Sequence, residues 1–146
     1  NALGVQSRVM SSLRLDQACE PFIRLRAIHH MEKGYVLILA GGTGSPFFTT
    51  DSAAALKAAE INADILLKGT NVDGVYDCDP NQNSNAKKFT HLTFQDALVK
   101  GLMVMDSTAF ALCQSQNIPL VVFDVRDFKN VKRVIKGEKV GTLITP

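Results

Sequence analysis

The hydrophobic and polar positions of this chain follow two periodicities. Short apolar runs bounded by turn residues predict β-strands, and apolar residues three or four positions apart predict helices. The expected strands are 5–13, 35–39, 63–68, 118–125 and 140–145, and the expected helices are 20–32, 51–61, 93–100, 106–116 and 128–136. Because strands alternate with helices along most of the chain, the pattern predicts an α/β fold with a mainly parallel sheet.

Two of these strands, 35–39 and 63–68, are apolar on both sides, as is typical of strands buried in a parallel sheet. The Asp73-Gly74 pair lies between apolar residues and predicts a tight hairpin turn. The polar segment 77–88 then predicts a surface loop. No internal repeat, low-complexity segment or linker is visible, so we expect one domain over residues 1–146.

Composition narrows the class of protein only moderately. With 46% hydrophobic and 21% charged residues the chain is typical of a globular protein, and its net charge of +2 does not indicate nucleic acid or membrane as a partner. The three cysteines form no CxxC pair and share no ligand spacing with the histidines, which favours free thiols over a zinc site. Asn1 is not a methionine, and Ala2-Leu3-Gly4 is similar to the end of a helix, so we expect the chain to begin inside a larger domain.

The segment from Gly41 to Asp51 contains the strongest chemical signal. It follows the apolar run 35–40 and precedes an alanine-rich helical run, which gives the order strand, glycine loop, helix. Glycines let backbone N–H groups approach a ligand, and the first turn of a helix leaves N–H donors unpaired. Thr49 and Thr50 add hydroxyl groups, and Asp51 adds a carboxylate. The segment predicts a phosphate-binding corner, and its alternative is an ordinary strand-to-helix turn capped by threonine.

A second group of polar residues, 68–80, follows the next expected strand. Ligands of open α/β sheets bind beyond the carboxyl ends of strands, so this segment and the glycine loop could face one crevice. Lys68 could pair with a phosphate and Tyr76 could stack on a base, whereas the alternative is a polar hairpin with solvated acids. Asp106 is most simply a helix cap. The basic residues of helix 128–136 indicate a solvated face, with an RNA-contact patch as the alternative.

Together these segments resemble the amino-acid-kinase family, and within it the uridylate kinases of bacteria and plastids. Residues 42–54 are similar almost letter for letter to the uridylate-binding signature of those enzymes, and residues 68–76 with Asp79-Pro80 resemble their ATP-contacting segment. Residues 104–106 and 137–145 are also typical. The resemblance implies a three-layer αβα sandwich with a mainly parallel sheet, of which the chain would hold the C-terminal portion.

The resemblance implies phosphoryl transfer from ATP to UMP, giving UDP in pyrimidine nucleotide biosynthesis, with Mg²⁺ as the companion of ATP. UMP would contact Thr43, Gly44, Ser45, Pro46, Phe47, Phe48, Thr49 and Thr50. ATP would contact Lys68, Thr70, Tyr76 and Asp79. Asp51 would orient the catalytic lysines and Asp106 would lie near the phosphates or the metal, so both are candidate catalytic residues. No residue is assigned to a resident metal.

Two departures from the family pattern are visible. Ser45 occupies a position where the family usually has asparagine, which alters one polar contact. The N-terminal half of the family, with its lysine-bearing glycine loop, its Gly-Gly-Gly-Asn turn and an arginine and an aspartate for the nucleotides, has no match among these residues. We therefore expect the chain to hold about half of an active site and to be inactive alone.

Two alternatives to a UMP kinase remain open. One is another enzyme of the family, such as a carbamate, acetylglutamate or aspartate kinase, although Pro46-Phe47-Phe48-Thr49-Thr50 argues against it. The other is a non-catalytic module that binds uridine nucleotides or RNA. By resemblance, we also expect a homohexamer with GTP and UTP as effectors, without membrane or nucleic acid as a partner. The expected compartment is the bacterial cytoplasm, or the plastid stroma in a plant or alga.

Overall fold

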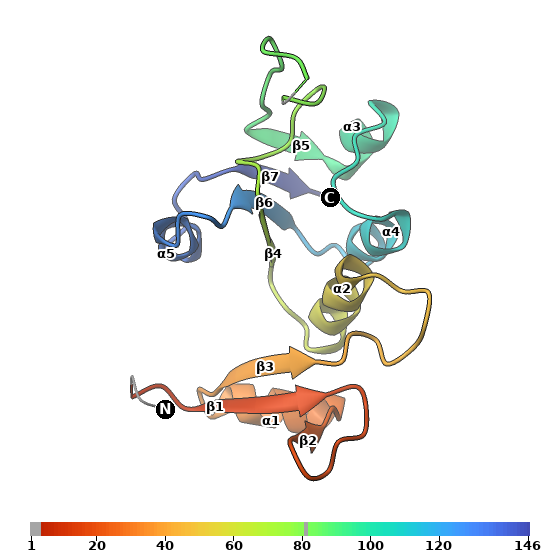
Figure 1. Ribbon diagram of the computed structural model, residues 1–146, viewed down its shortest axis with the longest axis vertical. Helices are drawn as coiled ribbons and strands as arrows, with labels where there is room; N and C mark the ends of the chain where they lie inside the picture. Colours follow the sequence, from red (N-terminus) through yellow and green to blue (C-terminus); the bar gives the residue numbers. More distant parts are fainter. Residues whose placement is uncertain (1–3, 81) are drawn as a thin grey trace. The chain divides into compact units, whose positions relative to one another are not determined.

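The computed structural model describes residues 4–80 and 82–146, and it divides into two compact units, Asn1–Asn62 and Ala63–Pro146 (Figure 1). The sequence pattern shows no linker at this division. The single domain expected over residues 1–146 stays a prediction. Within the described ranges, no helix has the length and apolar character of a membrane-spanning segment.

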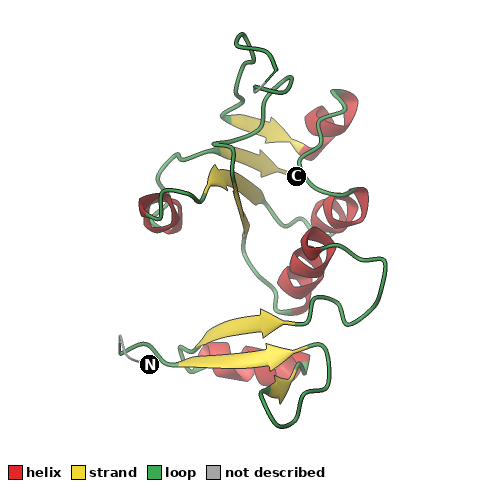
Figure 2. Cartoon of the chain, viewed as in Figure 1, coloured by secondary structure: helices red, strands yellow, loops and turns green. Residues whose placement is uncertain are grey.

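The first unit contains a three-stranded parallel sheet in the order β2-β1-β3 (Figures 1 and 2). Its elements are β1 (Ser7–Ser11), β2 (Glu20–Pro21), α1 (Arg24–Glu32), β3 (Val36–Ala40) and α2 (Thr50–Glu60). The helix expected at 20–32 begins only at Arg24, which corrects the sequence-based boundary. Pro21 disfavours the helical conformation for the residue before it, and Glu20 accordingly lies in an extended strand.

The prediction that strand 35–39 is buried on both faces was wrong. Along β3, exposed and half-buried positions alternate, and Val36 and Ile38 expose 53% and 51% of their surface. Val9, which pairs with Ile38 in the neighbouring strand, is also exposed. Within this unit the sheet is therefore covered on one face. Hydrophobic residues on both sides of a strand indicate that both faces could be buried, but they do not show that both are.

The second unit contains a four-stranded sheet in the order β4-β6-β7-β5. Its elements are β4 (Leu66–Thr70), β5 (His91–Thr93), α3 (Phe94–Val99), α4 (Ser107–Ser115), β6 (Leu120–Asp124), α5 (Lys129–Ile135) and β7 (Thr142–Thr145). The β4–β6 and β5–β7 pairs are parallel, whereas β6 and β7 are antiparallel. Both units confirm the expected α/β fold with mainly parallel sheets.

The core of the second unit is built where α3 and α4 bring their aromatic residues together. The rings of Phe94 and Phe110 meet edge to face, with their centroids 5.0 Å apart. Leu120 and Ile144, which pair across β6 and β7, are completely buried. Because β4 and β6 pair in parallel, their carboxyl ends place Thr70 and Asp124 at one edge of the sheet.

Two predicted helix starts are confirmed. Thr93 begins α3 in a capping box, in which its hydroxyl accepts from the Asp96 amide while the Asp96 carboxylate accepts from the Thr93 amide. The hydrogen bonds that Thr93 donates lower the pKa of Asp96. Asp106 begins α4, and its side chain accepts from the amide of Ala109 at 3.0 Å.

Two expectations for the second unit were wrong. The strand expected at 63–68 begins at Leu66 and is only half-buried. The tight hairpin expected at Asp73-Gly74 is absent from the described residues, because no paired strands flank it and Tyr76 forms only an isolated antiparallel bridge with Lys88. The Val75 amide, which would belong to a hairpin ladder, donates instead to the hydroxyl of Thr142.

Candidate functional site

The glycine loop after β3 adopts the backbone conformations that its sequence predicts. Gly41, Gly42 and Gly44 all have positive φ values, of 77°, 59° and 78°. The Gly44 amide donates to the carbonyl of Gly41 at 3.0 Å, which closes a tight turn. The Thr43 hydroxyl bridges to Ser45, since it accepts from the Ser45 amide and donates to the Ser45 carbonyl. The loop is exposed, with Thr43 partly buried, so its backbone is open to a ligand.

The end of β1 supports this loop from the side, which the sequence did not reveal. The Ser12 hydroxyl donates to the carbonyl of Gly42 at 2.8 Å, and the Ser12 amide donates to the carbonyl of Ala40. A Cβ at Gly41 would lie 2.8 Å from the Ser11 hydroxyl oxygen, so no larger residue fits there without a shift. The parallel pairing of β1 with β3 is the signal that could have placed Ser11 and Ser12 beside the loop.

The loop leads directly into α2. Thr49 is the N-cap, and its hydroxyl accepts from the Ser52 amide at 3.1 Å. Asp51 lies in the first turn, where a carboxylate interacts favourably with the helix dipole. Phe48 is exposed, and Phe47 is fully exposed with a φ of 69°, which is uncommon outside glycine. Two exposed aromatic side chains beside a helix N-terminus form a surface suited to a ligand that has both an apolar ring and an anionic group.

Replacing Thr49 by alanine is expected to lower the free energy of unfolding by about 1 kcal/mol, because the Ser52 amide loses its side-chain acceptor. Thr49→Ser keeps the hydroxyl and should stay within about 0.5 kcal/mol of the parent protein. Urea unfolding followed by circular dichroism measures both values. Equal losses in the two variants would show that the methyl group, and not the cap, accounts for the effect.

The second candidate site is a cavity of about 560 Å³ in the second unit. Its wall contains all four residues that resemblance assigns to ATP, Lys68, Thr70, Tyr76 and Asp79. The remaining lining residues come from the segments 72–80 and 101–104 and from Val122. The cavity thus opens where the polar segment leaves β4, as expected for a ligand site of an α/β sheet.

Two of these four residues, Lys68 and Thr70, lie at the end of β4 and have defined hydrogen-bond partners. The Lys68 ammonium group donates to the carbonyl of Val104 at 2.9 Å, which holds the lysine against the segment before α4. The Thr70 hydroxyl accepts from the Val72 amide and donates to the Val72 carbonyl. Both side chains are half-buried in the cavity wall. A cation and a hydroxyl at the end of one strand are suited to an anionic ligand.

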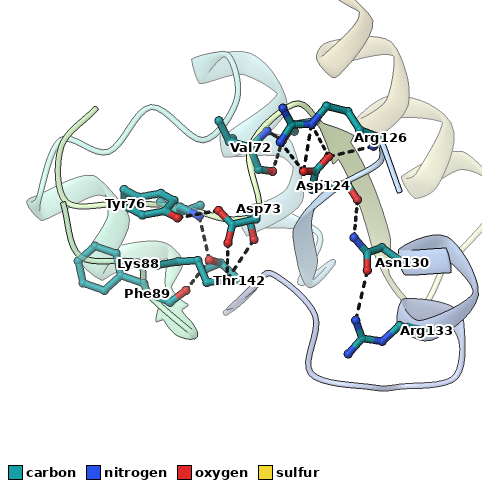
Figure 3. A network of polar contacts seen from close by, with 12 residues as sticks. Val72, Asp73, Tyr76, Lys88, Phe89, Asp124, Arg126, Asn130, Arg133 and Thr142 are labelled. Carbon is teal, nitrogen blue, oxygen red and sulfur yellow. Dashed lines mark hydrogen bonds and ion pairs between the residues drawn. The ribbon is translucent and has the colours of Figure 1, made fainter. Parts of the chain in front are cut away.

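Tyr76 belongs to a polar network that Figure 3 shows. Its hydroxyl donates to one carboxylate oxygen of Asp73 at 2.6 Å, and the Lys88 ammonium group donates to the other at 2.9 Å. These bonds, that of Tyr76 first, lower the pKa of Asp73, and the same carboxylate raises the pKa of Tyr76. Because the pKa is depressed in the folded state, the contact contributes stability above the ordinary carboxyl pKa and loses it as the pH falls through the lowered value.

The loop that follows carries Asp79 and a cysteine. The Lys87 amide donates to Asp77 at 2.8 Å and lowers the pKa of that carboxyl. Limited hydration and the neighbouring Asp77 raise the pKa of the Cys78 thiol, which disfavours the reactive thiolate. None of the three cysteines is in a disulfide, which agrees with the free thiols expected from their spacing.

The structure brings together some of the predicted site residues. The four residues assigned to ATP surround one cavity, and Asp106 follows its lining segment 101–104 by two positions. The eight residues assigned to UMP are continuous in the first unit and run from the loop after β3 into the first turn of α2, where Asp51 follows them. Among the described residues, no group of three or more histidine, cysteine, aspartate or glutamate side chains could hold a metal ion.

A glycine loop before a helix and a cavity at a strand end are the features at which α/β proteins commonly bind phosphate-bearing ligands, and this chain has both. The particular family is shown by comparison. The profile of the amino acid kinase family matches residues 1–124, and the chain belongs to that family.

Individual relatives share more than the family. The chain is 55% identical over 143 residues to the protein named uridylate kinase PUMPKIN, chloroplastic, of Arabidopsis thaliana, with 98% of this chain and 42% of the plant protein covered. Solved UMP kinases are similar at a TM-score of 0.93, with 40% identity for that of Bacillus anthracis and 43% for that of Ureaplasma parvum. The matches cover 97% and 100% of this chain, and 58% and 63% of those proteins. The chain therefore spans less than two thirds of the length of each of these relatives.

Proposed function

We propose that this chain is part of a UMP kinase, which transfers a phosphoryl group from ATP to UMP. The observation that supports this most strongly is the 55% identity to a protein named as a uridylate kinase over 98% of the chain, including the segment 42–54. UMP would lie on the loop from Thr43 to Thr50, with its phosphate at the amides that begin α2. ATP would occupy the cavity that Lys68, Thr70, Tyr76 and Asp79 line.

The chemistry of the two sites supports this assignment. Phosphoryl transfer needs little covalent chemistry from the protein and depends on positioning and charge stabilisation. The glycine loop supplies backbone donors, and Lys68 supplies a positive charge beside the cavity. Asp51 would orient lysines that bind the transferred group, and Asp106 would lie near the phosphates.

Mg²⁺ is the metal that this reaction implies. In proteins it uses one or two carboxylates together with substrate phosphates and keeps several waters. Asp77 and Asp79 line the cavity, and Asp106 follows the lining segment 101–104 by two positions. This donor set fits a Mg²⁺ ion that enters with ATP, where it would neutralise phosphate charge, and not a resident ion in a protein cage.

The test measures ATP-dependent phosphorylation of UMP by the natural protein that contains this chain. A coupled assay detects the ADP that the reaction forms. We expect UMP to be the preferred acceptor over carbamate, acetylglutamate and aspartate. We expect no turnover by the 146-residue chain alone above that of its Asp51→Asn variant, since the chain spans 42% of the plant relative. Uridine-nucleotide binding without turnover by the natural protein would favour a binding module, and preference for another acceptor would favour another kinase of the family.

We further propose a homohexamer, with GTP and UTP as effectors. In a plant source the compartment would be the plastid stroma, which the name of the Arabidopsis relative supports; in a bacterium it would be the cytoplasm. Light scattering of the natural protein, with and without GTP, tests the assembly. A monomer under both conditions would contradict it.

A further inference from the structure

One carboxylate organises the wall of the second-unit cavity without lining it. Val72, Gly74 and Tyr76 all line the cavity, whereas Asp73, which lies between them in sequence, does not. Asp73 instead accepts from the Tyr76 hydroxyl with one oxygen and from the Lys88 ammonium group with the other (Figure 3). Asp73 can therefore affect a ligand of the cavity through the groups that it holds.

Those groups fix both ends of the loop that carries Asp79. Tyr76 pairs with Lys88 in an isolated antiparallel bridge, and the Phe89 amide donates to the carbonyl of Val75 at 2.9 Å. The Asp77 amide donates to the carbonyl of Lys87 at 3.1 Å. The ion pair between Lys88 and Asp73 thus closes a clasp, defined here as residues 73–77 and 87–89.

The clasp is packed tightly against β7. The Thr142 hydroxyl accepts from the Val75 amide and donates to the carbonyl of Phe89, so it joins the two sides of the clasp. A Cβ at Gly74 would lie 2.6 Å from that hydroxyl oxygen and 3.0 Å from the Lys88 side chain. The backbone around Asp73 is therefore held in place, and its carboxylate is left to orient the Tyr76 ring and the Lys88 side chain.

We propose that Asp73 is a positioning residue for the nucleotide that enters this cavity, because it holds the Tyr76 ring and the Asp79 loop in one arrangement. This inference rests on the proposed function in that it takes ATP as the ligand. A ring that is already fixed costs less conformational entropy on binding than one that rotates freely. Removing the hydrogen bond between Asp73 and Tyr76 should therefore weaken the binding of ATP. The binding of UMP should stay unchanged, since UMP is assigned to the other unit.

The experiment compares Asp73→Asn, Tyr76→Phe and the double variant in the natural protein. Both single changes preserve side-chain volume, and Tyr76→Phe keeps the ring while removing the bond to Asp73. We expect each single variant to raise the KM for ATP about three- to tenfold, the usual net effect of one lost hydrogen bond, with kcat and the KM for UMP within about twofold. Because the two residues share one contact, the double variant should show much less than the product of the single effects.

Asp96→Asn is the matched control, because Asp96 is also an exposed carboxylate with two bonds to one neighbour, Thr93. We expect it to lower the melting temperature but not to change the KM for ATP. An unchanged KM for ATP in Asp73→Asn and Tyr76→Phe would overturn the inference, as would an equal rise in both KM values or fully multiplicative effects.

ATP binding measured by isothermal titration separates this inference from the proposed function. Weaker ATP binding by Asp73→Asn supports the inference even in a protein without turnover. If the parent protein phosphorylates UMP and the Asp73→Asn variant binds ATP with unchanged affinity, only the inference is overturned. A parent protein that does not bind ATP overturns both.

Discussion

Replacing Asp51 by asparagine is expected to lower kcat for UMP phosphorylation by about 100-fold or more, which is the usual cost of losing one electrostatic contact to a transition state. Asp51 lies half-buried in the first turn of α2, one residue beyond the loop assigned to UMP. Asparagine has nearly the same volume but carries no charge, so it loses the ionic attraction that would orient lysines at the transferred phosphoryl group. Steady-state kinetics with saturating ATP and UMP measure the loss.

Glu60→Gln is the control for this prediction. Glu60 is the last residue of the same helix and pairs with Lys57 at 2.8 Å, far along the chain from the glycine loop. We expect it to change kcat less than about twofold, because Glu60 lies at the opposite end of α2 from Asp51. An Asp51→Asn variant with kcat within threefold of the parent, or an equal loss in Glu60→Gln, would remove Asp51 from the catalytic assignment.

Replacing Gly141 by alanine is expected to destabilise the protein by about 3 kcal/mol or more, through backbone strain and overpacking together. Gly141 has a φ of 82°, and a Cβ there would collide with the backbone carbonyl oxygen of Val122. It would also lie 3.0 Å from the Cβ of Phe123. Because Thr142 pairs with Val122 at the start of β7, the collision would separate the two antiparallel strands. Urea unfolding of the variant measures the effect.

Gly137→Ala provides a matched comparison. Gly137 ends α5 with a φ of 78°, and a Cβ there would meet nothing within 4 Å. This variant therefore carries only the cost of a left-handed residue, about 1–2 kcal/mol. If the two alanine variants are equally destabilised, the contact with Val122 has no energetic weight and the prediction for Gly141 is wrong.

Helix starts were the best predicted part of the fold, because Thr93 and Asp106 act within one turn of their own position. The two shortest strands were missed, since β2 with two residues and β5 with three are too short to show a periodicity. The exposure of Val36 and Ile38 was also missed. Hydrophobic residues favour burial, but the sequence of one strand does not show which of its faces another element covers.

The candidate sites show the same division between local and distant contacts. The glycine loop and the residues after β4 were found because strand ends and turns are visible in the sequence. Ser12 and Lys88 were missed as partners of those segments, since their bonds to Gly42 and Asp73 cross 30 and 15 residues. The expected roles of the loop and cavity residues stay predictions until the variants above are measured.

The hydroxyl of Thr142 joins groups that leave the ribosome at very different times. It bonds to Val75 and Phe89, which precede it by 67 and 53 residues. At about 5–20 residues per second, a nascent chain would wait roughly 3 to 13 seconds after Val75 for this partner to be synthesised. The clasp beside the cavity is therefore completed only after Thr142 has been synthesised, so the loop that it closes is fixed later than the segments that form it.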